Sequence, residues 1–160
     1  MTFTICSLQK VTILNPAPAP DTIPDLVLSH IDFLTPNETE LAKVAGMPTE
    51  TIPEITAAAE ALLQRGVGNV LVTVGSRGAL LCNRNGSHLY PAYPQKAVDT
   101  TAAGDTFNAA FAVALAEGWT MDEAIVFANA AAGLSVTRKG AQTSIPCRSE
   151  VLDFMRDHAL

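Results

Sequence analysis

The chain has 160 residues and a mass of 16.8 kDa, which is the size of one domain of about 100–200 residues. Its 48% apolar content argues against intrinsic disorder, and a net charge of −6 without a basic cluster gives little support for binding nucleic acid or an anionic membrane. No apolar run reaches the roughly 18 residues of a transmembrane helix, and three widely spaced cysteines fit neither a disulfide framework nor a zinc site, so we expect a cytoplasmic protein.

The first third of the chain alternates short β-rich runs with helical segments, a pattern typical of an α/β fold with a largely parallel sheet. Short strands are expected over residues 11–14 and 31–34. Thr35 and Glu38 have the spacing of a capping box, which predicts a helix that begins after Thr35 and ends at Gly46.

The middle of the chain predicts a helix followed by three strands. The alanine-rich segment 53–65 is helical in pattern, and residues 69–74 form a nearly continuous apolar run, as expected for a strand buried on both faces. Runs over 78–82 and 87–90 flank an Asn-Gly pair, which is a strong signal for a β-hairpin.

The last third predicts three helices. The first is expected over 106–117 and the second over 120–136, where Thr120 and Glu123 have the spacing of a capping box. The second helix is almost entirely apolar or small, so we expect it to be buried on most sides. A short amphipathic helix over 149–158 closes the chain.

The stretch 99–108 (DTTAAGDTFN) carries the strongest chemical signal. Ala102, Ala103 and Gly104 are small and precede a strong helix, so their backbone N–H groups can converge on one anion with the help of the helix dipole. Asp105 lies at the mouth of this anion hole, where a carboxylate is unfavourable unless it has a role such as accepting a proton from an attacking hydroxyl. An equally good interpretation from spacing alone is that Asp105 caps the helix.

Three further features are weaker. A glycine loop follows the buried strand and either wraps a nucleotide or simply turns the chain; its residues are Thr73, Val74, Gly75, Ser76, Arg77 and Gly78. Asn37 and Glu40 share one face of a first helical turn, and they either order a magnesium ion through its waters or are two solvated residues. Residues 137–141 either present carbonyls to a monovalent cation or end a helix.

Taken together, the motifs resemble the ribokinase family of carbohydrate kinases, also called the PfkB family. Five strings occur in the family's order over residues 11–157: 14–18 (LNPAP), 35–40 (TPNETE), 73–78 (TVGSRG), 99–108 (DTTAAGDTFN) and 136–142 (VTRKGAQ). The resemblance implies a ribokinase-like fold, a three-layer α/β/α domain that is truncated on its N-terminal side. Residues 11–160 then form the C-terminal, nucleotide-binding and catalytic part, and residues 1–10 resemble nothing that we can place.

The resemblance also implies functional roles. The expected reaction is ATP-dependent phosphorylation of a sugar, with ribose converted to ribose 5-phosphate. Asp105 is the expected general base and contacts the sugar hydroxyl, and Ala102, Ala103 and Gly104 form the anion hole, where Ala102 replaces a glycine common in the family. The expected ATP contacts are Asn37, Thr73, Val74, Gly75, Ser76, Arg77, Gly78, Gly104 and Asn129.

Two metal ions are implied in the same way. Glu40 is expected to hold Mg²⁺ indirectly. An activating K⁺ is expected at Asp99, Thr101, Ser135, Arg138, Gly140 and Ser144, partly through backbone carbonyls.

Family members are roughly twice as long as this chain, which leaves alternatives open. The chain is a kinase for ribose, a kinase for another sugar or a nucleoside, a nucleotide-binding fragment without sugar turnover, or an interaction module whose motifs are relics. Charged residues make up only 16% of the chain, as expected if part of its surface normally lies against other protein. We therefore also predict self-association, including a homodimer, through an exposed sheet edge.

Overall fold

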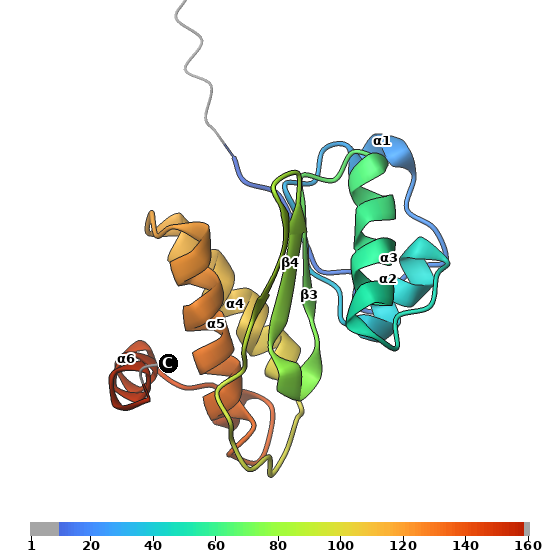
Figure 1. Cartoon of the computed structure of the whole chain (residues 1–160). Coiled ribbons are helices and arrows are strands. Elements are labelled where there is room, and N and C mark those ends of the chain that lie inside the picture. Colours follow the sequence, from blue (N-terminus) through green and yellow to red (C-terminus); the bar gives the residue numbers. More distant parts are fainter. Residues whose placement is uncertain (1–9, 159–160) are drawn as a thin grey trace, which may run out of the picture.

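The computed structural model describes residues 10–158 and has three layers (Figure 1). A five-stranded sheet lies in the middle, helices α1, α2 and α3 cover one face, and α4, α5 and α6 lie on the other. The predicted α/β/α arrangement is confirmed. The segment that we could not place, residues 1–10, lies outside the described residues except for its last residue.

The strand order is β1-β2-β3-β4-β5, with bounds Ile13–Leu14, Phe33–Leu34, Asn69–Thr73, Ala79–Asn83 and Gly86–Tyr90. The pairs β1–β2 and β2–β3 are parallel, whereas β4 is antiparallel to both β3 and β5. Four of the five described strands therefore run in the same direction, in agreement with the largely parallel sheet that was predicted. β1 and β5 are the edge strands, and self-association through an edge stays a prediction.

β3 is buried on both faces, as its apolar run predicted. Val70, Leu71 and Val72 are all fully buried. Because successive side chains of a strand point to opposite faces, Val70 and Val72 pack in the core beneath α2 and α3, whereas Leu71 packs in the core beneath α4 and α5. The single strand thus joins two separate hydrophobic cores.

The helices on the first face are α1 (Asp25–Leu28), α2 (Glu38–Ala45) and α3 (Ile52–Gln64). The start predicted for α2 is wrong by two residues: its N-cap is Asn37 rather than Thr35. The reason is that Thr35 is still part of the extended chain after β2, where its backbone N–H donates to the Leu14 carbonyl at 2.9 Å and its side chain is buried. α3 agrees with its prediction within one residue at each end.

The helices on the second face are α4 (Ala103–Ala116), α5 (Met121–Ser135) and α6 (Arg148–Asp157). α5 and α6 agree with their predictions, but α4 begins three residues before the predicted Thr106. Residues 10–158 contain no helix with the length and hydrophobicity that crossing a lipid bilayer requires.

The hairpin is confirmed, but its turn lies one residue earlier than an Asn-Gly turn would. Asn83 pairs with Gly86, so the two residues between the strands are Arg84 and Asn85. The Asn83 side chain accepts a hydrogen bond from the Asn85 backbone N–H at 2.9 Å, which stabilises the turn locally.

Candidate active site

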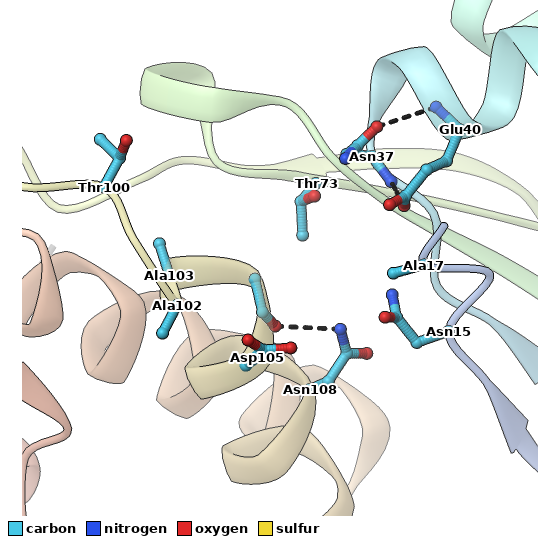
Figure 2. Close-up of a pocket in the computed structure, with 11 residues that line it drawn as sticks. Asn15, Ala17, Asn37, Glu40, Thr73, Thr100, Ala102, Ala103, Asp105 and Asn108 are labelled. Atoms are coloured by element: carbon cyan, nitrogen blue, oxygen red, sulfur yellow. Dashed lines mark hydrogen bonds between the residues drawn. The ribbon is translucent and has the colours of Figure 1, made fainter. Parts of the chain in front are cut away.

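The carboxyl ends of the parallel strands and the first turn of α4 enclose a small cavity of about 180 Å³ (Figure 2). In open α/β sheets this edge is where ligands bind. Polar and small residues line the cavity: Asn15, Ala17, Asn37, Glu40, Thr73, Thr100, Ala102, Ala103, Gly104, Asp105 and Asn108. Residues from four distant parts of the chain therefore meet around one space.

A larger cavity of about 750 Å³ adjoins the small one. Five residues line both: Asn37, Thr73, Thr100, Ala103 and Gly104. The larger cavity is also lined by the glycine loop after β3 and by the buried Asn129 of α5. The predicted anion hole and most of the predicted nucleotide loop thus face one continuous space of a size typical for small-molecule sites.

The start of α4 has an unusual backbone. Ala102 is the N-cap and has φ 61°, and it is the one non-glycine residue with positive φ among the described residues. Among the described residues, the backbone N–H groups of Gly104 and Asp105 have no hydrogen-bond acceptor. The next backbone N–H, that of Thr106, donates to the Ala102 carbonyl at 2.8 Å. Two free donors at a helix N-terminus favour an anion.

Asp105 lies inside the first turn of α4, so the interpretation of Asp105 as the helix cap is wrong. Because the helix begins at Ala103, the N-cap position falls on Ala102, which makes no side-chain cap. The Asp105 carboxylate is exposed to the small cavity and makes no hydrogen bond or ion pair with any residue of 10–158. It is free to interact with a ligand.

Asn37 and Glu40 form the capping box of α2. The Glu40 backbone N–H donates to Asn37 Oδ1 and the Asn37 backbone N–H donates to Glu40 Oε2, both at 2.8 Å. Neither interpretation from the sequence included this structural role, which also holds both side chains at the wall of the cavity (Figure 2). A Mg²⁺ role for Glu40 stays a prediction.

The glycine loop does not present all six of its residues to the cavity. Thr73, Gly75, Ser76 and Gly78 line the larger cavity, and the other two do not. Val74 is buried in the core, and Arg77 forms an ion pair with Glu38 of α2. Contacts of ATP with Val74 and Arg77 stay a prediction.

Asn129 holds the chain after β5 against α5. Its Nδ2 donates to the carbonyls of Tyr90 at 3.1 Å and Pro91 at 3.3 Å. Because the side-chain donors are engaged with the backbone, Asn129 shapes the wall of the larger cavity, and its contact with ATP stays a prediction.

Asp99 joins two of the segments predicted to bind K⁺. Its carboxylate accepts the backbone N–H groups of Thr101 and Gly140, each at 2.9 Å. Hydrogen bonds from the Thr101 side chain and from these two backbone groups lower the pKa of Asp99 to about 2. The loop before α4 and the loop after α5 are therefore tied together at this carboxylate.

The other residues predicted at the K⁺ site have local partners. The Ser135 hydroxyl donates to the Ala132 carbonyl and the Ser144 hydroxyl to the Ala141 carbonyl, both at 2.8 Å. Arg138 pairs with Glu150 of α6 at 2.6 Å. Within the part of the chain that the structure describes, no three His, Cys, Asp or Glu side chains gather around a metal position. A K⁺ site built from carbonyl oxygens stays a prediction.

Four residues of the small cavity had no role in the sequence analysis: Asn15, Ala17, Thr100 and Asn108. Asn15 follows β1 and its Nδ2 donates to the Thr35 carbonyl at 2.7 Å. Asn108 follows Asp105 by three residues, a spacing that places both on one face of α4. This helical spacing was the available signal for Asn108, whereas the position of Asn15 depends on the pairing of distant strands.

Residues 2–148 match the model of the pfkB family of carbohydrate kinases. The chain is 44% identical over 147 residues to a ribokinase of Haemophilus influenzae, with 92% of this chain and 47% of the relative covered. It is 46% identical over 136 residues to a ribokinase of Arabidopsis thaliana, with 84% and 36% covered. The chain thus spans half or less of the length of these relatives.

Solved structures of two ribokinases also match this chain. Ribokinase of Thermotoga maritima superposes with a TM-score of 0.84 at 46% identity, with 94% of this chain and 50% of that chain covered. Arabidopsis thaliana ribokinase, solved in complex with ribose and ATP, superposes with a TM-score of 0.85 at 44% identity, with 91% and 47% covered.

Proposed function

Because the chain belongs to the pfkB family of carbohydrate kinases, we propose that it takes part in transferring the terminal phosphoryl group of ATP to a hydroxyl of a sugar, with ribose as the substrate. The observation that carries the proposal is a shared space. Asp105, whose carboxylate is free, lines the small cavity, and Gly104 lines both cavities. The backbone N–H groups of Gly104 and Asp105 in the first turn of α4 have no acceptor among the described residues.

In this proposal each of the two cavities binds one of the two substrates. The larger one, about 750 Å³, has room for a nucleotide, and its glycine loop lets a ligand approach the backbone closely. The terminal phosphate then meets the N–H groups of Gly104 and Asp105 at the positive end of α4. The sugar hydroxyl approaches from the small cavity, beside the Asp105 carboxylate.

Asp105 acts as the general base in this proposal. As the hydroxyl oxygen bonds to the terminal phosphorus, the bond between that phosphorus and the bridging oxygen of ADP breaks, and the hydroxyl proton passes to Asp105. The negative charge on the transferring group is stabilised by donors that are already oriented, so little reorganisation is needed. An unpaired carboxylate beside an anion site is otherwise unfavourable, which supports a chemical role for Asp105.

The family implies two ions, and the acceptor groups present fit one of them well. Glu40 has a carboxylate oxygen outside the capping box, and with Asn37 it would hold Mg²⁺ through water; bound Mg²⁺ neutralises phosphate charge. For K⁺ we propose a site near Asp99, Thr101 and Gly140. The hydrogen bonds of Asp99 to the other two residues join the loop before α4 to the loop after α5.

The test is ribose-dependent release of ADP in the presence of Mg²⁺ and K⁺. Asp105→Asn should lower turnover by about 10²- to 10⁴-fold, the usual contribution of a general base, while the thermal shift with ATP and Mg²⁺ is retained. Asp157→Asn, an exposed carboxylate at the end of α6, is the matched control and should leave both unchanged. Turnover of Asp105→Asn near that of the wild type would refute the role of Asp105.

A second candidate is nucleotide binding without sugar turnover. This chain covers 47% and 36% of the two ribokinases, so sugar turnover by the chain itself is decided by the assay. A thermal shift with ATP and Mg²⁺ but no ribose-dependent ADP release would select it. If turnover is found, a panel of sugars and nucleosides decides the substrate, since a deoxyribokinase is also 38% identical over 143 residues.

A further inference from the structure

Asn108 carries an unexplained polar atom in the small cavity. Its Nδ2 donates to the Gly104 carbonyl at 2.9 Å, one helical turn back along α4. This bond determines which way the amide points, because reversing it would set two carbonyl oxygens against each other. Oδ1 is therefore the atom left over. It is buried, and among the described residues it has no hydrogen-bond partner.

A buried acceptor without a donor is destabilising in the folded protein, so such an atom calls for an explanation. Asn108 and Asp105 lie on the same face of α4 and both line the small cavity, as does Asn15 (Figure 2). The residue that carries the unpaired oxygen therefore lines the same cavity as the carboxylate proposed to receive the hydroxyl proton.

The chemistry of the cavity limits what can satisfy this oxygen. Asp105 and Glu40 contribute carboxylates, and Asn108 Oδ1 is an acceptor, so a phosphate oxygen placed against Oδ1, rather than against the free N–H groups of Gly104 and Asp105, would meet repulsion. A ligand group that donates hydrogen bonds is required. At about 180 Å³, the cavity has room for a polyhydroxylated group of a few carbon atoms but not for a nucleotide.

We infer that Asn108 Oδ1 accepts a hydrogen bond from a hydroxyl of the phosphoryl acceptor, a hydroxyl next to the one that Asp105 deprotonates. Asn108 is then a substrate-binding and specificity-determining residue. The inference rests on the proposed sugar kinase function, and it adds to it a requirement for a second hydroxyl near the reacting one.

The experiment measures kcat, and KM for ribose and for ATP, in the wild type, Asn108→Ala and the control Ala109→Gln, which is exposed on the same helix and lines neither cavity. Loss of one hydrogen bond to a buried group predicts a KM for ribose raised by roughly tenfold in Asn108→Ala. The KM for ATP should stay within about twofold, and the control should match the wild type.

A series of monodeoxy riboses tests the contact itself. For the analogue that lacks the bonded hydroxyl, Asn108→Ala and the wild type should have the same KM, because the interaction is absent in both. Each comparison is the ratio of the KM values of one variant for two sugars. A general loss of stability in Asn108→Ala affects both KM values and therefore cancels in the ratio.

Three results overturn the inference. The first is an equal loss for ribose and for every deoxy analogue. The second is an altered Mg²⁺ dependence at saturating ribose with no change in the KM for ribose, which would assign Oδ1 to the water around the metal. The third is a wild type that shows a thermal shift with ATP and Mg²⁺ but no response to ribose, which leaves nucleotide binding intact. A wild type without either response would refute the proposed function itself.

Discussion

Replacing Gly78 by alanine tests how the glycine loop is fitted to the chain after β5. Gly78 has φ 108°, and a Cβ atom built there would lie 2.0 Å from the Tyr90 carbonyl oxygen and 2.6 Å from the Ala92 nitrogen. Both neighbours are backbone, so neither can rotate away. We expect unfavourable backbone strain of about 1–3 kcal/mol and overpacking of about 1–3 kcal/mol, together about 2–6 kcal/mol of lost stability.

Gly75 provides the matched comparison. It also has positive φ, 57°, but a Cβ atom there has no neighbour within 4 Å. Gly75→Ala should therefore cost about 1–2 kcal/mol, from backbone conformation alone. The free energy of unfolding in urea, measured for the wild type and both variants, gives the excess loss in Gly78→Ala, which comes from the close approach and from the different backbone conformation of Gly78. Equal losses in Gly78→Ala and Gly75→Ala would refute the reasoning.

Two other predictions concern the start of α4. Ala102→Gly should stabilise the protein by up to about 1.5 kcal/mol, because φ 61° costs alanine about 1–2 kcal/mol while glycine adds about 0.5–1 kcal/mol of chain entropy. Ala103→Gly, inside the helix, should destabilise it, and equal destabilisation of both variants in urea would contradict this account. Because hydrogen bonds lower the pKa of Asp99 to about 2, the ionised carboxylate stabilises the fold above about pH 4, and this stabilisation is lost as the pH falls toward 2. The difference in melting temperature between the wild type and Asp99→Asn should therefore narrow over that range. A constant difference would contradict this prediction.

The sequence predicted most of the fold because its signals are local. The capping box at Thr120, the alanine-rich pattern of α3 and the apolar run of β3 need no tertiary contact to be recognised, and all three are confirmed. The family resemblance seen in the motifs is confirmed too. Local signals failed where a distant segment decided the outcome: Thr35 does not cap α2, because β1 holds it in an extended conformation.

The candidate site was predicted less completely than the fold. The grouping of Asn37, Thr73, Gly104 and Asp105 around adjoining cavities agrees with the motifs. Sequence spacing could not show that α4 begins at Ala103, because alanine rarely adopts the positive φ that Ala102 has here. Nor could it show that Asn108 Oδ1 is left without a partner, since that depends on the amide bonding back to Gly104.

The alternating burial of β3 has a consequence for the site at its end. Thr73, the last residue of β3, lines both cavities, and the side chains that hold the strand belong to two cores on opposite faces of the sheet. A slip of β3 by one residue would turn Val70 and Val72 toward the α4 and α5 side and Leu71 toward the α2 and α3 side. The position of the cavity wall is therefore determined by the packing of two independent layers, and a packing defect in either one would be transmitted to the place where the two substrates meet.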